Sequence, residues 1–178
     1  VWSGGGDDMV WGEDGNDYVD AGDGNDHVDG GWGDDWLYGG WGNDYVSGGD
    51  GNDYARGGDG SDAMYGDEGY DRLYGDKGHD HLGGGGDYDL LWGGKGRDTF
   101  HFGQGSDRDV IKDFNPRFDK ISLYGLDLDD ATIKVGRNKT TFDFGDTDYD
   151  GQNETLVVYG LKYKPAMEHK IFVQDDIA

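Results

Sequence analysis

Residues 39–65 read GGWGNDYVSGGDGNDYARGGDGSDAMY and contain the same nine-residue unit three times. Each unit has glycine at positions one, two and four, aspartate at position six and an apolar residue at position eight. A period that is fixed in this way is typical of a solenoid, whose repeats stack as successive coils. The stretch therefore predicts a repeat architecture.

The nine-residue phase runs from residue 3 to residue 110 without an insertion. Position four is glycine in eleven of the twelve repeats, with Asp87 as the exception, and position eight is apolar until Asp109 in the last repeat. Position six is aspartate throughout: Asp8, Asp17, Asp26, Asp35, Asp44, Asp53, Asp62, Asp71, Asp80, Asp89, Asp98 and Asp107. A flexible glycine-rich linker, the alternative interpretation, has no reason to keep an apolar residue in step with the glycines.

The glycines and the apolar positions together predict the path of the backbone. Glycines at alternate positions allow positive φ, so we expect positions one to six to form a tight turn. Positions seven to nine then form a short strand whose middle residue points inward. Since each repeat reverses the chain, two repeats make one coil of 18 residues, with odd repeats stacked on one side and even repeats on the other.

This stacking places the aspartates in two files. The odd file contains Asp8, Asp26, Asp44, Asp62, Asp80 and Asp98, and the even file contains Asp17, Asp35, Asp53, Asp71, Asp89 and Asp107. Neighbours in a file lie about 4.8 Å apart, and two carboxylates at that distance repel by roughly 1–3 kcal/mol. Calcium takes about six to eight oxygen ligands, from carboxylates and backbone carbonyls. We therefore expect calcium ions between successive turns of the same file.

The charge of the chain agrees with this expectation. Residues 1–110 contain 26 acidic and 6 basic side chains, a net charge of −20, and the ten gaps of two six-membered files would hold ten divalent ions. The whole chain carries −24, which argues against nucleic acid and anionic membranes as partners. The sequence shows no apolar run of membrane-spanning length, no cysteine and, from Val1 onward, no N-terminal signal peptide.

Units such as GGWGDDWLY (30–38) and GGDGNDYAR (48–56) resemble the nonapeptide Gly-Gly-x-Gly-x-Asp-x-apolar-x of the RTX, or haemolysin-type, calcium-binding family. The resemblance implies an all-β, right-handed parallel β-roll over residues 1–107, built from two sheets. It also implies that each calcium is held between same-side turns by position-six aspartates and by carbonyls of the glycine turn. Such turn glycines are Gly22, Gly24, Gly31, Gly33, Gly40, Gly42, Gly49, Gly51, Gly58 and Gly60.

Several repeats depart from the family pattern. Position two is aspartate at Asp67 and Asp76, and position four is aspartate at Asp87. Aspartate adopts positive φ less readily than glycine but tolerates it. We expect the most regular calcium sites within residues 3–65 and the least regular ones near Asp87 and Arg97.

Residues 108–178 have a different composition and are predicted to cap the roll. The stretch DVIKDFNPRFDKISLYGL (109–126) resembles the segment that ends many RTX arrays. Alternating stretches at 131–135, 140–145, 155–161 and 169–174 predict antiparallel strands, which would cover the open end of the roll. The resemblance also implies export by a type I system, through a signal near IFVQDDIA (171–178), and a longer, secreted parent protein.

The segment GDTDYDGQNE (145–154) places Asp146, Asp148 and Asp150 at the spacing of an EF-hand loop. Val157 stands where such a loop has its bidentate glutamate. The segment is either an additional, irregular calcium loop or a solvated acidic turn between strands.

Outward positions of the even repeats carry an aromatic strip, which consists of Tyr18, Trp36, Tyr38, Tyr54, Tyr74 and Trp92. One interpretation is that neighbouring rings stabilise the sheet by cross-strand contact. The other is that the strip binds a polysaccharide or a protein. The sequence leaves both open.

The first functional hypothesis is a calcium-binding module that is disordered without calcium and folds on binding it outside the cell, so supporting secretion. The alternative is a binding appendage of the adhesin or epimerase type, which would use the aromatic strip. No histidine spacing typical of zinc proteases and no nucleophile–base arrangement occurs, so we predict no catalysis by these residues. A secreted protease or lipase upstream is the third hypothesis.

Overall fold

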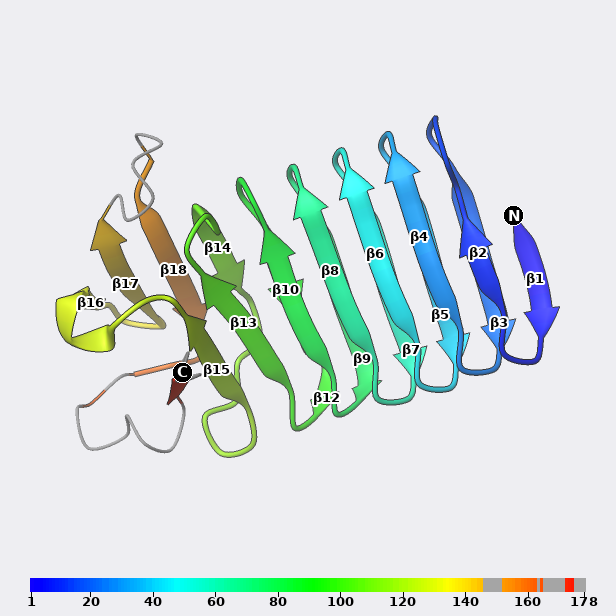
Figure 1. Cartoon of the computed structure of the whole chain (residues 1–178). Helices are drawn as coiled ribbons and strands as arrows, with labels where there is room; N and C mark the ends of the chain where they lie inside the picture. Colours follow the sequence, from blue (N-terminus) through cyan, green and yellow to red (C-terminus); the bar gives the residue numbers. More distant parts are fainter. Residues whose placement is uncertain (146–151, 163, 165–171, 175–178) are drawn as a thin grey trace.

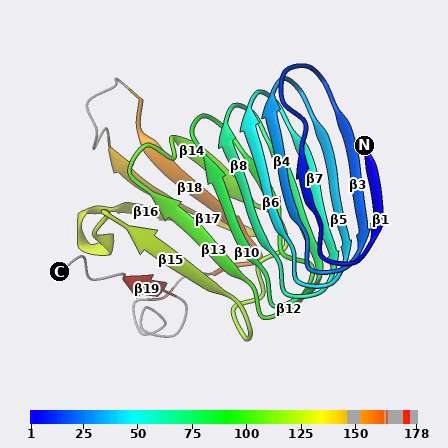
Figure 2. The same ribbon diagram turned by 45° about the vertical axis from the view of Figure 1, so that its right-hand side comes forward.

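A computed structural model describes residues 1–145, 152–162, 164 and 172–174. The chain winds into a flattened coil with two facing sheets, and the coils follow one another from the N-terminus toward the C-terminal segment (Figures 1 and 2). Within the repeats, each coil gives one strand to each sheet. We call the two sheets the even sheet and the odd sheet, after the repeats in which their strands begin.

The even sheet contains, in spatial order, β1 (Trp2–Gly5), β3 (Tyr18–Asp23), β5 (Trp36–Trp41), β7 (Tyr54–Asp59), β9 (Arg72–Gly78), β11 (Leu90–Trp92), β14 (Arg108–Ile111), β18 (Glu154–Tyr159), β17 (Lys139–Gly145) and β16 (Thr132–Val135), with β12 (Lys95–Gly96) on β9. The odd sheet contains β2 (Met9–Trp11), β4 (His27–Trp32), β6 (Tyr45–Asp50), β8 (Ala63–Glu68), β10 (His81–Gly85), β13 (Thr99–Gly103), β15 (Lys120–Tyr124) and β19 (Phe172–Gln174). A short 3₁₀ helix, η1 (Leu128–Asp130), follows β15.

The strands of the roll pair in parallel, and up to β11 and β13 each paired residue lies opposite the residue 18 places later. Val19 pairs with Leu37 in this way, and Leu37 pairs with Ala55. The predicted two-sheet parallel solenoid with 18 residues per coil is therefore confirmed.

The strands are longer than predicted, because positions one to three continue the strand instead of turning. β5, for example, has six residues and runs from position seven to position three of the next repeat. The turn is confined to positions four to six. Gly42, which begins it, has a φ of +126°, and Gly40, two residues earlier in β5, has a φ of +114°. Both conformations favour glycine, which has no Cβ.

Four acidic residues take the left-handed conformation in place of glycine. The φ angle is 73° at Glu13, 74° at Asp67, 71° at Asp76 and 67° at Asp87. The coil therefore keeps its turn geometry at the departures from the repeat pattern.

A narrow apolar core lies between the sheets. The position-eight residues are all buried, as predicted: Val10, Val19, Val28, Leu37, Val46, Ala55, Met64, Leu73, Leu82, Leu91 and Phe100. Toward the C-terminal segment the core side chains become larger. The rings of Phe102 and Phe144 lie 5.8 Å apart, and those of Phe142 and Phe172 lie 5.2 Å apart.

The C-terminal strands extend both sheets of the roll. β16, β17 and β18 are antiparallel to one another, as predicted. β18 nevertheless pairs with β14 in parallel, and β19 pairs with β15 in parallel, so the antiparallel prediction is wrong for residues 172–174. Both sheets run past residue 107, the predicted boundary between roll and cap.

Two predicted features lie wholly or mostly outside the described residues. These are the acidic loop with Asp146, Asp148 and Asp150, and the stretch at 171–178 apart from Phe172–Gln174. Among the helices of the described residues, none has the length and apolar composition needed to cross a membrane.

Candidate metal sites

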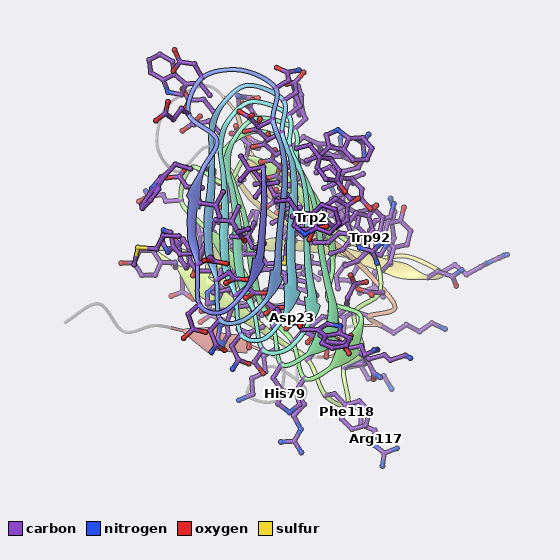
Figure 3. All side chains as sticks on the ribbon, turned by 90° about the vertical axis from the view of Figure 1, so that its right-hand side faces the viewer. Trp2, Asp23, His79, Trp92, Arg117 and Phe118 are labelled. Carbon is purple, nitrogen blue, oxygen red and sulfur yellow. The ribbon has the colours of Figure 1, made fainter. Side chains whose placement is uncertain are left out.

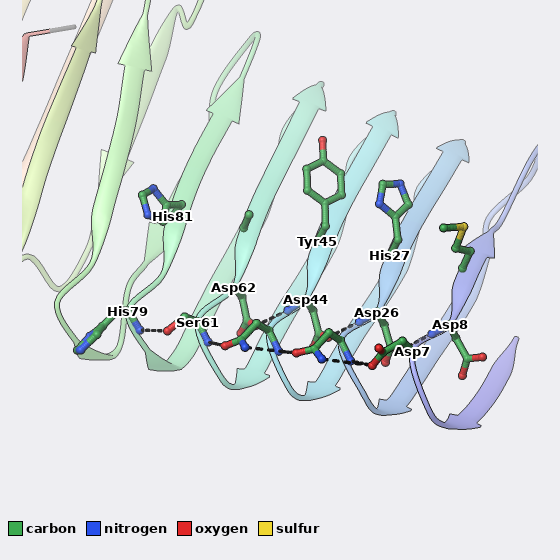
Figure 4. A pocket seen from close by; sticks show the side chains of 14 residues that line it. Asp7, Asp8, Asp26, His27, Asp44, Tyr45, Ser61, Asp62, His79 and His81 are labelled. Atoms are coloured by element: carbon green, nitrogen blue, oxygen red, sulfur yellow. Dashed lines mark hydrogen bonds between the residues drawn. The ribbon is translucent and has the colours of Figure 1, made fainter.

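The position-six aspartates stand in line along the two edges of the roll, where each turn enters the next strand. Figure 4 shows part of the odd file, with Asp8, Asp26, Asp44 and Asp62 side by side on successive coils. The inner members of both files are between 0 and 3% exposed: Asp26, Asp35, Asp44, Asp53, Asp62, Asp71, Asp80, Asp89 and Asp98. The prediction of two aspartate files is therefore confirmed, and their carboxylates are buried.

One carboxylate oxygen of each aspartate after the first in its file, up to Asp89 and Asp98, is held by the backbone of the preceding coil. The Asp26 N–H donates to Oδ1 of Asp44 at 2.8 Å, and the Asp35 N–H donates to Oδ1 of Asp53 at 2.8 Å. The same bond recurs along both files. This ladder fixes the orientation of the carboxylates that accept its bonds.

The other carboxylate oxygen, Oδ2, is buried and receives no hydrogen bond from the described residues. This holds for Asp8, Asp26, Asp35, Asp44, Asp53, Asp62, Asp71, Asp80 and Asp89. A buried carboxylate oxygen without a donor is costly, and a row of them is stable only if cations or protons lie between the coils.

A backbone carbonyl shares the space beside several of these oxygens, those of Asp35, Asp44, Asp53, Asp71 and Asp80. A Cβ built on Gly48, at position one, would lie 2.3 Å from Oδ2 of Asp53 and 2.5 Å from the carbonyl oxygen of Gly66. Glycine at position one thus leaves a small space lined by a carboxylate and a carbonyl oxygen. Oxygen donors of this kind are the ligands of a hard cation such as calcium.

The carbonyls predicted as ligands, at positions two and four, run along the stack. A Cβ on Gly40 would lie 2.1 Å from the carbonyl oxygen of Gly22, and one on Gly42 would lie 1.8 Å from that of Gly24. Their role as ligands stays a prediction. The position-one carbonyls, which lie beside Oδ2, were not singled out by the sequence pattern.

Burial makes the carboxyls of the files difficult to ionise. It raises the pKa of Asp44, Asp53 and Asp98 to about 6, against an ordinary value of 3.8, and the backbone N–H bonds offset only part of this effect. The same cause raises the pKa to about 7 at Asp62, Asp80 and Asp89 and to about 8 at Asp71. A cation between the carboxylates would favour the ionised form.

The structure corrects the predicted end of the even file. Leu90 of β11 pairs with Val110 of β14, 20 residues later, so Asp109 follows Asp89 in the file and Asp107 does not. Two additional residues before β14 cause this shift. Oδ2 of Asp107 instead accepts the N–H of Asp87 at 3.1 Å.

The odd file ends on Asp119, which the repeat pattern did not reveal. Oδ1 of Asp119 accepts the N–H of Asp98 at 3.2 Å, and its Oδ2 accepts the N–H of Asn115 at 2.7 Å. Both oxygens of this terminal carboxylate therefore have backbone donors. The only signal in the sequence was its place in FDKIS, directly before β15.

A second ladder, at position five, lies on the outer side of the odd file and was also missed. The N–H groups of Asn25 and Asn43 donate to Oδ1 of Asp7 and Asn25 at 2.8 and 2.9 Å. Ser61 continues the series, and its Oγ accepts the N–H of His79 at 3.3 Å (Figure 4). This ladder links the coils with mostly neutral side chains.

The predicted aromatic strip forms a row of neighbouring rings on the outer face of the even sheet. Ring centroids lie 4.9 Å apart for Trp36 and Tyr54, 5.1 Å for Tyr54 and Tyr74, and 4.4 Å for Tyr74 and Trp92. Tyr18 and Tyr38 form a further pair at 5.6 Å. Figure 3 shows Trp92 on the flank of the roll. These ring contacts support the interpretation in which neighbouring aromatic side chains stabilise the sheet.

The described residues contain no group of three or more His, Cys, Asp or Glu side chains that could hold a metal ion. A site in the roll would therefore combine two carboxylates of one file with backbone carbonyls. That donor set suits calcium, which accepts both kinds of oxygen.

Comparison with known proteins agrees with this chemistry. The model of the RTX calcium-binding nonapeptide repeat (4 copies) matches residues 2–37, 33–55, 38–73, 56–91 and 74–109. None of the curated proteins matches this chain.

Two solved structures are similar to the chain. One is a subunit of the mannuronan C5-epimerase from Azotobacter vinelandii, with 23% identity over 80% of this chain and 88% of that chain, and a TM-score of 0.48. The other is the extracellular lipase from Serratia marcescens, with 19% identity over 94% of this chain, and a TM-score of 0.47. The match spans 38% of the lipase.

Proposed function

Because the chain belongs to the RTX calcium-binding nonapeptide repeat family, we propose that it is a calcium-dependent folding module of a secreted protein. The observation that carries the proposal is the row of buried Oδ2 atoms that receive no donor from the described residues. Without cations the roll must protonate these groups or leave them buried and charged. With calcium in the gaps, the same groups become ligands.

The module is largely unfolded without calcium in this proposal. The acidic excess of residues 1–110 is 20 charges, and the core between the sheets is one narrow row of side chains. Calcium that binds only the folded chain stabilises it by mass action. About ten ions, one for each gap in the two files, would balance the acidic excess.

The affinity of such sites connects folding to secretion. Extracellular calcium modules bind with dissociation constants of about 10⁻⁴–10⁻³ M, so their sites stay empty at cytosolic calcium levels. RTX repeats are typical of extracellular proteins exported by type I systems. We therefore propose that the chain leaves the cell unfolded, by type I secretion, and folds outside as part of its parent protein.

A calcium titration of the metal-free chain at pH 7.5 tests the proposal, with far-UV circular dichroism and tryptophan fluorescence as readouts. We expect a cooperative gain of β structure with calcium. Magnesium is the control, because it keeps its waters and demands octahedral geometry, and it should have little effect. A folded spectrum in excess chelator at this pH would refute the proposal.

A second candidate function is binding of a polysaccharide or a protein along the even sheet. Its support is that Tyr18 and Trp36 are 56% and 52% exposed although they belong to a continuous row of rings. Lys112 extends the row toward the cap, since its Nζ lies 5.7 Å from the Trp92 ring and 5.2 Å from the Tyr159 ring. Flat aromatic surfaces of this kind stack on sugars.

A glycan array with the calcium-loaded chain tests this second function. Trp36→Ala should abolish a bound signal, whereas Trp32→Ala should leave it unchanged, because Trp32 is 64% exposed but ends β4 of the odd sheet. A parent chain with no signal, or equal losses in both variants, would reject the aromatic strip as a binding face. We assign no catalytic step to this module, and any enzymatic chemistry of the parent protein lies in other residues.

A further inference from the structure

We propose that the last cation site of the even file lies outside the nonapeptide register, between Asp89 and Asp109 at the junction of the roll and the cap. The inference rests on the proposed function, since it assumes that cations occupy the gaps of the files. It gives Asp109 the ligand role that the repeat pattern assigns to Asp107. The ligand is a hard divalent cation, calcium above all, because both side chains offer only oxygen.

The state of Asp109 carries the inference. Its side chain is 0% exposed, and neither Oδ1 nor Oδ2 receives a hydrogen bond from the described residues. In the regular part of the file one oxygen is always bound by a backbone N–H, as in the bond from Asp71 to Asp89 at 2.8 Å. The N–H of Asp89 still favours the ionised form of Asp109, as the corresponding N–H does along the file, but it makes no hydrogen bond of normal geometry with either oxygen.

The surroundings of Asp109 are acidic. The charges of Asp89 and Asp107 both disfavour its ionisation, and Asp87 and Asp107 disfavour that of Asp89. Arg108, the nearest basic residue in sequence, has its guanidinium 5.6 Å from the Tyr88 ring. The negative charge at the junction is thus concentrated around one buried, fully unsatisfied carboxyl.

A proton is the competing occupant of this gap. A protonated Asp109 forms a hydrogen bond with Asp89, and burial together with this contact raises the pKa of Asp109 well above its usual range. The end of the odd file shows how the chain avoids both occupants, because backbone N–H groups satisfy both oxygens of Asp119. Asp109 has only the N–H of Asp89 nearby, without a hydrogen bond of normal geometry, so the two ends of the files differ in how far the backbone satisfies them.

The position of Asp109 gives the site a structural consequence. Asp109 lies in β14, which pairs with β11 of the roll on one side and with β18 of the cap on the other. An ion held by Asp89 and Asp109 would fix β14 to the last regular coil, and with it the strand on which the cap is built.

Two single substitutions separate this site from the one that the repeat pattern predicts. The ions bound per calcium-loaded chain are counted by native mass spectrometry for the parent, Asp109→Asn and Asp107→Asn. We expect Asp109→Asn to bind one ion fewer than the parent and Asp107→Asn to bind the same number. Loss of the ion in Asp107→Asn, or an unchanged count in Asp109→Asn, would overturn the inference.

A crystal structure of the calcium-loaded parent chain provides the second test, since Asp109→Asn could fold poorly. We expect an ion within about 2.3–2.6 Å of oxygens of both Asp89 and Asp109. Direct carboxyl–carboxyl contact with ions in the other gaps would overturn this inference and leave the proposed function intact. A folded, ion-free roll would overturn both.

Discussion

The roll and the cap satisfy their buried acidic groups in different ways. In the roll, file members such as Asp44 and Asp53 have one oxygen bound by a backbone N–H and one with no donor. In the cap, Asp113 accepts the N–H groups of Gly93 and Gly94 at 3.0 and 2.9 Å, and Asp119 is likewise satisfied at both oxygens. Under the proposed function, cations complete the unsatisfied carboxylates of the roll, whereas the protein alone satisfies these cap carboxyls.

A change of pH should have the largest effect on the difference between roll and cap, because it changes the protonation of many file carboxyls at once. The pKa values of about 6 to 8 in the folded roll exceed the ordinary value of 3.8, so the folded state binds more protons than the unfolded state. The resulting stability is fully present below about pH 4 and is lost as the pH rises through 6 to 8.

Each raised unit of pKa corresponds to about 1.4 kcal/mol per group, so we expect the calcium-free chain to be folded at pH 5 and largely unfolded at pH 8. Thermal melts followed by circular dichroism, on chain freed of calcium beforehand, measure this. Equal melting temperatures at the two pH values would show that the buried carboxyls do not control folding.

Replacement of a turn glycine by alanine should have the next largest effect on stability. A Cβ on Gly60, where φ is +156°, would lie 1.6 Å from the carbonyl oxygen of Gly42. We expect Gly60→Ala to lower the free energy of unfolding in calcium by about 4 kcal/mol or more, through backbone strain and overpacking. Gly6→Ala is the matched control, because Gly6 has φ of +106° and no atom within 4 Å of its Cβ.

Chemical denaturation of both variants in saturating calcium gives the two free energies. The control should cost only about 1–2 kcal/mol, the strain of the backbone alone. If the two variants are equally destabilised, close stacking of the coils is not what requires glycine at position four.

The effect of Asp44→Asn on the free energy of unfolding should change sign when calcium is added. Without calcium at pH 5, where we expect the calcium-free chain to be folded, the variant removes a carboxyl whose charge burial disfavours, and we expect the free energy of unfolding to rise by about 1–3 kcal/mol. In calcium the variant weakens the gaps on both sides of Asp44, toward Asp26 and Asp62. Tenfold weaker binding at each gap lowers the stability by about 3 kcal/mol.

Denaturant titrations of the parent and the variant, in calcium at pH 7.5 and without calcium at pH 5, show whether Asp44→Asn raises or lowers the free energy of unfolding. The even file provides an internal control, since sites between its members Asp35 and Asp53 should keep their affinity. A loss of stability in both conditions would mean that Asp44 acts through its hydrogen bond to Asp26 and not through its charge.

The smallest expected effect concerns the aromatic strip. Tyr54 lies between the rings of Trp36 and Tyr74, so Tyr54→Ala should lower the stability of the calcium-loaded chain by about 1 kcal/mol. Tyr70→Ala, at an exposed turn position, should cost little. Equal thermal melts for the parent and Tyr54→Ala would remove the evidence that the rings stabilise the sheet.

The sequence was sufficient to predict the coil, the two sheets and the two files, because a constant period determines which residues lie side by side. It overestimated the turn, since the glycines at positions one and two resemble turn residues although they continue the strand. Their real contribution is spatial: the missing Cβ of Gly48 leaves room beside Oδ2 of Asp53.

The ends of the files could not be predicted from the period. The offset between paired residues grows from 18 to 20 at Val110 and to 21 at Lys120, because irregular segments precede β14 and β15. The repeat pattern therefore pointed to Asp107, whereas Asp109 and Asp119 occupy the terminal places. Only the strand pairing reveals such a shift in register.

Amide hydrogen exchange at pH 7.5, with and without calcium, tests most directly whether cations hold the roll together. We expect the amides of β3 to β10 to be strongly protected in saturating calcium. When calcium is removed, they should lose at least about a hundredfold of that protection, or about 2.7 kcal/mol. Protection that stays the same in calcium-free buffer would contradict a role for cations in holding the roll together.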